Sequence, residues 1–442
     1  MENKCKIILM DDVHLEGRSS EMCTDFALKI INKIKEIKQQ NYIPIVVCAG
    51  DIGEGITGID WAKQFDCNVV YICGNHEFWG QDYYVEINSI KEKLKDPSYS
   101  HIKFLHNESV IIHGIKFIGA TLWTDLGNSF NWKTKNLIVR FYSAMGDFKR
   151  ITSKQWYTDE NIKKLRHFLE INGVDSNKID ELILNKGFNP LLEIEENKKS
   201  FNFLFKEINQ QYSGISIVVT HHLPALEPWI KKFKITEESL SNDCFNDEKN
   251  FFDAAKGNSH PSKDLLLMGF YTNNFKKLFL TKNSPHYWLH GHLHEPIDDL
   301  IGKTKIISSP VGYFKQSKEM TFKEIIPNEY HKDLSNYVKK EIETFQWNSE
   351  ILENIRGFEI IISQYEIIIS SGLATVSDFN LISNAFLKNH NYAIEKINKK
   401  TIDWLSFLFY SENPELTGKV NDEEIKEKIG FNLYLKKQID NG

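Results

Sequence analysis

Short apolar runs that end in Asp, His or Asn are the feature that most constrains the fold of this chain. Three of them lie at 6–10, 43–49 and 68–73, and an amphipathic helical pattern at 24–39 separates the first two. This alternation is typical of a buried, partly parallel α/β sheet. Because ligands of such sheets bind at the carboxyl ends of the strands, the polar residues after each run are the candidate site.

The first two runs end in residues that bind metal ions. Asp12 and His14 are two apart after the first run, so a carboxylate and an imidazole can converge on one ion. Asp51 lies between Gly50 and Gly53, which allow close backbone approach, and its carboxylate can bridge two ions. Taken singly, each motif also fits a solvated loop, a helix cap or a simple turn.

The third run leads into Asn75 and His76. An amide oxygen suits a hard divalent ion in a mixed nitrogen and oxygen site better than it suits a structural zinc. With Asn75 as a ligand, His76 is free to act on the substrate. Asn75 can equally be the N-cap of a helix, and the two roles are compatible.

Two later runs repeat the pattern. Residues 215–220 lead into His221, and residues 287–289 lead toward His292 and His294. Five strand ends with metal-binding residue types are hard to explain by structure alone, so a metal centre is predicted.

In the order of these motifs the chain resembles the calcineurin-like metallophosphoesterase superfamily: Asp12-x-His14, Gly50-Asp51, Gly74-Asn75-His76-Glu77, Thr220-His221-His222 and Gly291-His292-x-His294. It is similar in particular to a bacterial phosphohydrolase subgroup, through segments such as GDIGEGITGIDWA, CGNHEFWG and WLHGHLHEP. The resemblance covers residues 5–315. It implies an α/β fold, a four-layer αββα sandwich.

The resemblance also implies a dinuclear metal centre. The first ion would be held by Asp12, His14, Asp51 and His294, and the second by Asp51, Asn75, His221 and His292. A metal-bridging hydroxide would attack a phosphodiester, and His76, oriented by Glu77 or a backbone carbonyl, would stabilise or protonate the leaving oxygen. Two divalent ions are expected, with Mn²⁺ favoured and Fe or Zn also compatible.

Further residues are candidates for substrate contact. Arg150, next to Asp147 and Lys149, can grip a phosphate, or it can belong to a solvated loop. His222 fits a substrate contact, a ligand or a residue behind His221. A buried, hydrogen-bonded role is favoured for His290. Three tryptophans can form a base-stacking wall or belong to the core: Trp79, Trp123 and Trp132.

Small phosphodiesters or nucleotides are the favoured substrates, and a nuclease acting on DNA or RNA is the alternative. The net charge is −6, from 54 Lys and Arg against 60 Asp and Glu, and lysine pairs such as 198–199 and 276–277 are short. A protein Ser/Thr phosphatase is disfavoured. The branch of the superfamily that contains those phosphatases has Asp-Arg-Gly after its Gly-Asp motif, and Gly50-Asp51 of this chain is not followed by that sequence. An inactive scaffold is the alternative from another class, and the complete ligand set disfavours it.

Two domains are predicted: a phosphoesterase domain at 1–326, with a helical insertion at about 158–211, and a helical C-terminal domain at 327–442 of unknown role. The C-terminal helices are candidates for self-association or for binding a protein partner. Six scattered cysteines without CxxC spacing are expected to be reduced packing residues. With no signal peptide or membrane span apparent, a cytoplasmic protein is expected.

Overall fold

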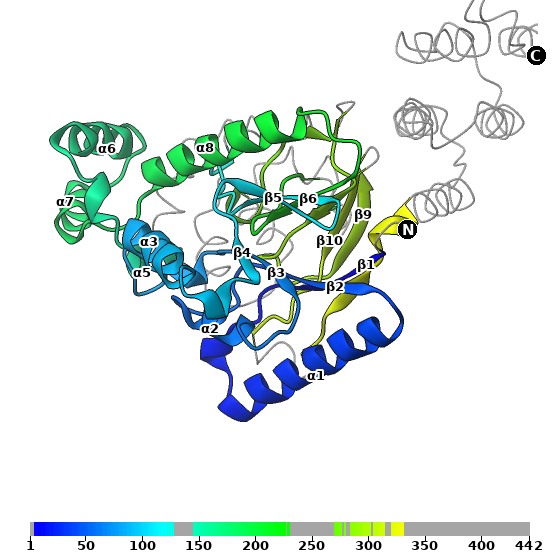
Figure 1. Cartoon of the computed structure of the whole chain (residues 1–442). Coiled ribbons are helices and arrows are strands. Elements are labelled where there is room, and N and C mark those ends of the chain that lie inside the picture. The colour runs from blue at the N-terminus through cyan, green and yellow to red at the C-terminus, as the bar shows by residue number, and fades with distance from the viewer. Residues whose placement is uncertain are drawn as a thin grey trace, which may run out of the picture. The chain divides into compact units, whose positions relative to one another are not determined.

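A five-stranded sheet forms from the N-terminal runs in the computed structural model, which describes residues 4–127, 145–226, 228–229, 269–275, 278–279, 283–301, 304–313 and 320–330 (Figure 1). Its order is β11-β1-β2-β3-β4. The strands are β1 (Cys5–Met10), β2 (Ile43–Ala49), β3 (Asn68–Ile72), β4 (Ile102–Phe104) and β11 (Lys323–Ile325). All neighbours are parallel except β11, which runs antiparallel to β1.

Helices connect the parallel strands of this sheet. They are α1 (Ser20–Gln39), α2 (Thr57–Ala62) and α3 (Tyr83–Lys93). The predicted strands and the helix at 24–39 are confirmed to within a few residues. Helix α2 was not predicted, because its six residues are too few for a helical period and include Gly58.

The second sheet has six strands in the order β5-β6-β7-β8-β10-β9. They are β5 (Glu108–Ile112), β6 (Ile115–Ala120), β7 (Ile215–Thr220), β8 (Tyr287–Leu289), β9 (Ile297–Ile301) and β10 (Thr304–Ser308). A hairpin turns at Gly114, since β5 and β6 are antiparallel and His113 and Gly114 between them both have positive φ. Strands β6, β7, β8 and β10 are parallel.

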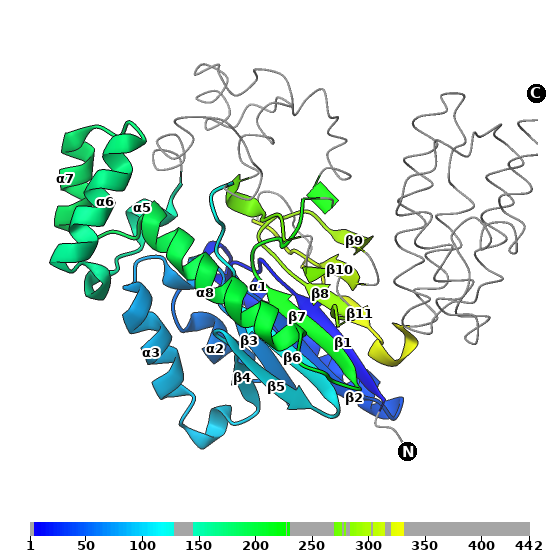
Figure 2. The same cartoon turned by 90° about the horizontal axis from the view of Figure 1, so that it is seen from above.

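The two sheets pack face to face and helices cover their outer faces. A Cβ added to Gly119 of β6 would meet Leu105 and Ile72, which shows how closely the sheets approach. Helix α1 lies outside the first sheet, and α8 (Pro190–Ile208) lies across the second, next to β6 (Figures 1 and 2). The predicted four-layer αββα sandwich is therefore confirmed.

Helices fill the segment in which an insertion was expected. After the short α5 (Asp147–Arg150), which precedes this segment, they are α6 (Asp159–Ile171), α7 (Ser176–Asn185) and α8, and α6 packs on α7. Thr158, Asp175 and Asn189 cap the last three through side-chain oxygens, and Pro190 is the first residue of α8. Short 3-10 helices complete the described elements: η1 (Leu15–Gly17), η2 (His76–Phe78), η3 (Pro97–Tyr99), η5 (Lys154–Trp156) and η8 (Pro327–Glu329).

The chain divides into two compact units, residues 1–300 with 304–328 and residues 301–303 with 329–442. The predicted C-terminal helices fall almost wholly outside the described residues, as do Trp132, Cys244 and the lysines at 276–277. Cys48 and Cys73, which lie in or next to the predicted strands, are free and buried. Among the described helices, none is long and apolar enough to cross a membrane.

Candidate metal centre

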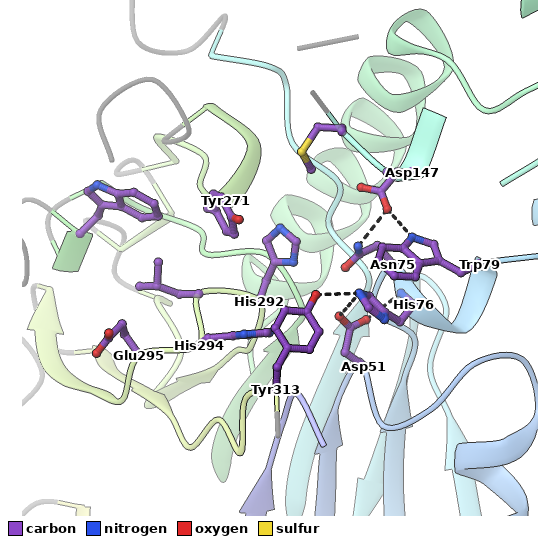
Figure 3. A pocket seen from close by; sticks show the side chains of 14 residues that line it. Asp51, Asn75, His76, Trp79, Asp147, Tyr271, His292, His294, Glu295 and Tyr313 are labelled. Carbon is purple, nitrogen blue, oxygen red and sulfur yellow. Dashed lines mark hydrogen bonds and ion pairs between the residues drawn. The ribbon is translucent and has the colours of Figure 1, made fainter. Parts of the chain in front are cut away.

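Five strand ends from both sheets bring the seven predicted ligand residues to one edge of the sandwich. Asp12 and His14 follow β1, Asp51 follows β2, Asn75 follows β3, His221 follows β7, and His292 and His294 follow β8. Figure 3 shows Asp51, Asn75, His292 and His294 turned toward one cavity. The geometry agrees with the rule that open α/β sheets bind ligands at the carboxyl ends of their strands.

Asp12, His14 and His294 form the first group of candidate ligands. His294 Nε2 lies 3.0 Å from His14 Nε2 and 3.3 Å from Asp12 Oδ1, and His14 Nε2 lies 3.9 Å from the same oxygen. Asp12 Oδ1 is buried without a hydrogen-bond partner. A cation among these atoms would satisfy that oxygen and could be bound by both ring nitrogens.

The second group surrounds His221. Its Nε2 lies 3.3 Å from Asp51 Oδ2, 3.2 Å from Asn75 Oδ1 and 3.2 Å from His292 Nδ1. His221 Nδ1 lies 3.0 Å from the carbonyl oxygen of Ala49, a contact that places the hydrogen of the neutral imidazole on Nδ1 and leaves Nε2 to bind a cation. Four atoms that can each coordinate a metal ion then face one point, an arrangement that fits a divalent cation.

Asp51 lies between the two groups. Its Oδ2 is 3.3 Å from His221 Nε2 and 4.0 Å from His14 Nε2. Burial raises the pKa of this carboxyl, but the nearby charges of His221, His76 and His14 outweigh burial and hold it well below its usual range. An ionised carboxylate in this position can contact a cation in either group.

Strained backbone marks the same residues. Among the described residues, eleven non-glycine residues have positive φ, and five of them are candidate ligands: Asp12 (51°), His14 (50°), Asp51 (53°), His292 (70°) and His294 (53°). Left-handed backbone in non-glycine residues costs free energy and persists where the surrounding structure enforces it, as at binding sites. The side chains therefore converge because tertiary contacts hold the loops in this conformation.

Glycines at three strand ends leave room for His221. A Cβ added to Gly50, Gly74 or Gly291 would come within 3.0 Å of the His221 ring. Gly50 also has a φ of 88°, which side chains rarely adopt. The glycines of these motifs thus set the spacing between the strand ends and the ligand.

Glu77 does not orient His76, contrary to expectation. Its carboxylate accepts hydrogen bonds from the backbone N–H groups of Asp51 (3.0 Å), Ile52 (2.9 Å) and Gly74 (2.7 Å), and from Tyr71 Oη (2.9 Å). It therefore ties the end of β2 to the end of β3. The loop conformation directs the Glu77 side chain into the protein, away from the His76 ring.

The contacts of His76 come from other residues. Its Nδ1 lies 2.9 Å from Glu16 Oε1. Figure 3 shows its other two neighbours: Tyr313, whose Oη is 3.2 Å from His76 Nε2, and Trp79, on which the ring stacks with centroids 3.4 Å apart. Burial lowers the pKa of His76, but the charges of Asp51 and Glu16 and the Glu16 hydrogen bond raise it overall. Sequence reasoning did not single out Glu16 or Tyr313, although Tyr313 lies in a segment, SSPVGYF, that is part of the resemblance.

Asp147 fixes the amide of Asn75. One carboxylate oxygen, Oδ1, accepts from Asn75 Nδ2 (2.9 Å) and from Trp79 Nε1 (2.6 Å), as Figure 3 shows. The amide oxygen of Asn75 is thereby turned toward His221. Asn75 directly precedes η2, but its side chain makes no capping hydrogen bond there.

A cavity of about 420 Å³ opens beside the cluster. The described residues that line it are Asp51, Asn75, His76, Trp79, Met145, Gly146, Asp147, Trp229, Tyr271, His292, Leu293, His294, Glu295 and Tyr313. They include carboxylates and aromatic rings but neither Lys nor Arg.

Four other candidates are absent from the described lining of this cavity: Arg150, His222, His290 and Trp123. The Arg150 guanidinium stacks over Trp79 at 4.0 Å and lies 3.6 Å from Glu54. His222 is buried against His292, with ring centroids 4.2 Å apart, and burial with the nearby charge of His221 lowers its pKa to about 3. His290 is also buried and lies 3.0 Å from the carbonyl oxygen of Gly291. Trp123 is in the core, packed against Phe188.

The solved structures that are similar to this chain include the following two. One is the phosphopantetheinyl hydrolase of Mycobacterium tuberculosis, with 12% identity, a TM-score of 0.43, and coverage of 74% of this chain and 98% of that one. The other is a "putative 5′-nucleotidase" of Staphylococcus aureus, with 12% identity, a TM-score of 0.32, and coverage of 76% of this chain and 59% of that one. No family model and no curated sequence matches the chain. At such low similarity, function has to be inferred from this chain's own residues.

Proposed function

We propose that the chain is a divalent-metal-dependent phosphoesterase that hydrolyses a small phosphodiester or nucleotide. The observation that carries this proposal is the pair of acceptor clusters on either side of Asp51, next to His76 and an open cavity. Buried acceptors that face one another are unfavourable without a cation between them. The arrangement is therefore best explained as a site for two ions that share Asp51.

The residues would divide between the ions as the resemblance implies. Asp12, His14 and His294 would hold one ion, Asn75, His221 and His292 the other, and Asp51 both. Bound divalent cations supply Lewis-acid activation of water and neutralise phosphoryl charge. Ligands of mixed nitrogen and oxygen type are compatible with Mn²⁺, Fe or Zn²⁺, and Mn²⁺ is favoured by the hard oxygen donors.

His76 has the position expected of a proton donor. Its Nε2 lies 3.8 Å from Asp51 Oδ2, at the wall of the cavity, so a phosphoryl group near Asp51 would be within its reach. Trp79 holds one face of the ring, and Asp147 in turn holds the Trp79 indole. These contacts restrict the ring before a substrate arrives, which lowers the cost of reaching the reactive geometry.

The cavity wall favours a small substrate over a nucleic acid. Trp79, Trp229, Tyr271 and Tyr313 supply aromatic surface, and the described lining residues include neither Lys nor Arg. The many phosphates of a nucleic acid would lack cationic side chains on the described part of this wall, whereas one phosphoryl group with an uncharged substituent would fit it. In the lysine pair at 198–199, Lys199 already forms an ion pair with Glu196, in which Nζ and Oε1 are 2.6 Å apart.

The test is Mn²⁺-dependent hydrolysis of bis(p-nitrophenyl) phosphate by the wild type and by Asp51→Asn and His76→Ala. Asp51→Asn should lose Mn²⁺ affinity and at least about 10³-fold in kcat/KM. His76→Ala should keep Mn²⁺ binding and lose about 10²- to 10⁴-fold in kcat. Glu92→Gln, an exposed change far from the site in a Glu92–Lys95 pair, is the control.

Two outcomes would redirect the proposal. Faster cleavage of oligonucleotides than of small diesters, with a steep decrease in rate as salt increases, would favour the nuclease. Mn²⁺ binding without hydrolysis of any phosphoester would favour an inactive scaffold.

A further inference from the structure

Glu16 contacts two histidines with a single oxygen. Its Oε1 lies 3.2 Å from His14 Nδ1 and 2.9 Å from His76 Nδ1. His14 is a candidate metal ligand and His76 is the candidate proton donor, and their rings are 4.4 Å apart. The Glu16 side chain is 23% exposed, so solvent reaches it only in part.

The loop that carries Glu16 is held on several sides. The N–H groups of His14 and Leu15 donate to the carbonyl oxygens of Asp51 and Ile52, each at 3.0 Å. The 3-10 turn η1 (Leu15–Gly17) then closes with a hydrogen bond from Gly17 N–H to His14 O. The position of the Glu16 carboxylate is therefore set by the backbone of two strand ends.

Arg18 adds a second anchor beyond the turn. Its Nε donates to Val13 O at 2.8 Å, and its guanidinium also donates to Gly312 O. Gly312 precedes Tyr313, whose ring stacks on His14 with centroids 4.4 Å apart. Arg18 thus links the segment that contains Glu16 to the segment that contains Tyr313, beside the contact between the His14 and His76 rings.

We propose that Glu16 is a positioning residue that fixes the ring orientation and tautomer of His14 and His76 together. A carboxylate oxygen only accepts hydrogen bonds, so both Nδ1 atoms must carry hydrogen. His14 Nε2 is then an acceptor, and it faces His294 Nε2 and Asp12 Oδ1 in the first group of candidate ligands. His76 Nε2 is directed into the cavity. The role of Glu16 at His76 rests on the proposed function, while its role at His14 concerns cation binding alone.

One substitution should therefore affect two properties at once. Loss of the carboxylate in Glu16→Ala should weaken Mn²⁺ binding by about 10- to 100-fold, as expected when the partner of a metal-binding histidine is removed. It should also lower kcat by about 10²-fold with KM within a few-fold, because His76 loses its partner while the cavity wall is intact. Glu16→Gln retains an acceptor oxygen and should recover a large part of both losses.

The experiment compares wild type, Glu16→Ala, Glu16→Gln and the control Glu21→Gln, an exposed change in the first turn of α1. Mn²⁺ affinity is measured by calorimetric titration of the metal-free proteins. The tautomers are measured from imidazole ¹⁵N chemical shifts without metal, assigned with His14→Ala and His76→Ala. Thermal unfolding checks that each variant is folded, and Glu16→Gln replaces Glu16→Ala if the alanine variant is not.

Glu16→Ala with unchanged ¹⁵N shifts and unchanged Mn²⁺ affinity would overturn the inference, even in an active enzyme. Altered shifts and weaker binding would support it. If the wild type binds Mn²⁺ but hydrolyses no phosphoester, the proposed function fails, and the shifts and affinities still decide the role of Glu16.

Discussion

Replacing Gly74 with alanine would test whether close packing of the strand ends creates the metal centre. The added Cβ would overlap Asp51 Oδ1 and lie 2.7 Å from both Asp51 N and His221 Cε1. Carbon atoms pack without strain at about 3.5 Å or more, so the His221 ring must move by about 0.8 Å and the Asp51 carboxylate by more than that. The φ of Gly74 is not in the positive range, so the effect would be steric.

Both displaced residues are candidate ligands, so cation binding is the sensitive measurement. Overpacking should cost about 1–3 kcal/mol of stability. A displacement near 1 Å should weaken Mn²⁺ binding by about 10- to 100-fold, and kcat by a similar factor. Calorimetric titration with Mn²⁺ and urea unfolding of the metal-free protein measure the two effects.

Gly17→Ala is the matched control, because its added Cβ would meet nothing within 4 Å. It should change stability by less than about 0.5 kcal/mol. If Gly74→Ala bound Mn²⁺ as tightly as the wild type and unfolded at the same urea concentration, the packing argument would be wrong.

Three further predictions concern the same centre. Asp147→Ala should weaken Mn²⁺ binding about tenfold by freeing the Asn75 amide, whereas Asp147→Asn keeps an acceptor and should bind nearly normally; equal affinities would contradict this role. Burial lowers the pKa of His221, but Asp51 outweighs it and raises that pKa to about 9. Because the folded value exceeds the unfolded one, the stabilisation is full below about pH 6.5 and is lost as pH rises toward 9. In the presence of a metal chelator, the unfolding free energy of the wild type should therefore decrease between about pH 6.5 and pH 9. The decrease should be about 1–3 kcal/mol larger than that of His221→Gln. Finally, Mn²⁺ at 100 times its Kd should raise the unfolding free energy by about 2.7 kcal/mol, reversibly with chelator, and no shift in the melting temperature would exclude a site in the folded state.

The strands could be predicted from the sequence because they are buried on both faces. The runs of β1, β2 and β3 are almost wholly buried, and a buried parallel strand is a continuous apolar run that is visible locally. Helix α2 gives no such signal, because it is short. The candidate ligands could be named for the same reason as the strands, since each directly follows a run at a known edge of the sheet.

The contacts of His76 could not be predicted in this way. Glu77 is its sequence neighbour and was expected to orient it, yet Glu77 holds backbone N–H groups and Glu16 is the partner. Likewise, Asp147 reaches Asn75 from 72 residues away. Polar loop residues have no periodicity, and nothing local indicates which distant group they will meet.

The sequence by itself determined which residue types stand at the ends of the strands. A buried strand is visible locally as an apolar run, and the direction of the chain tells which residues follow it. Only the tertiary structure decided which atoms face one another. His14 and His294, whose Nε2 atoms are 3.0 Å apart, are separated by 280 residues. Their ring orientations depend on hydrogen bonds and strained loops that form only when both sheets pack, so the chemistry of the edge is a property of the folded chain.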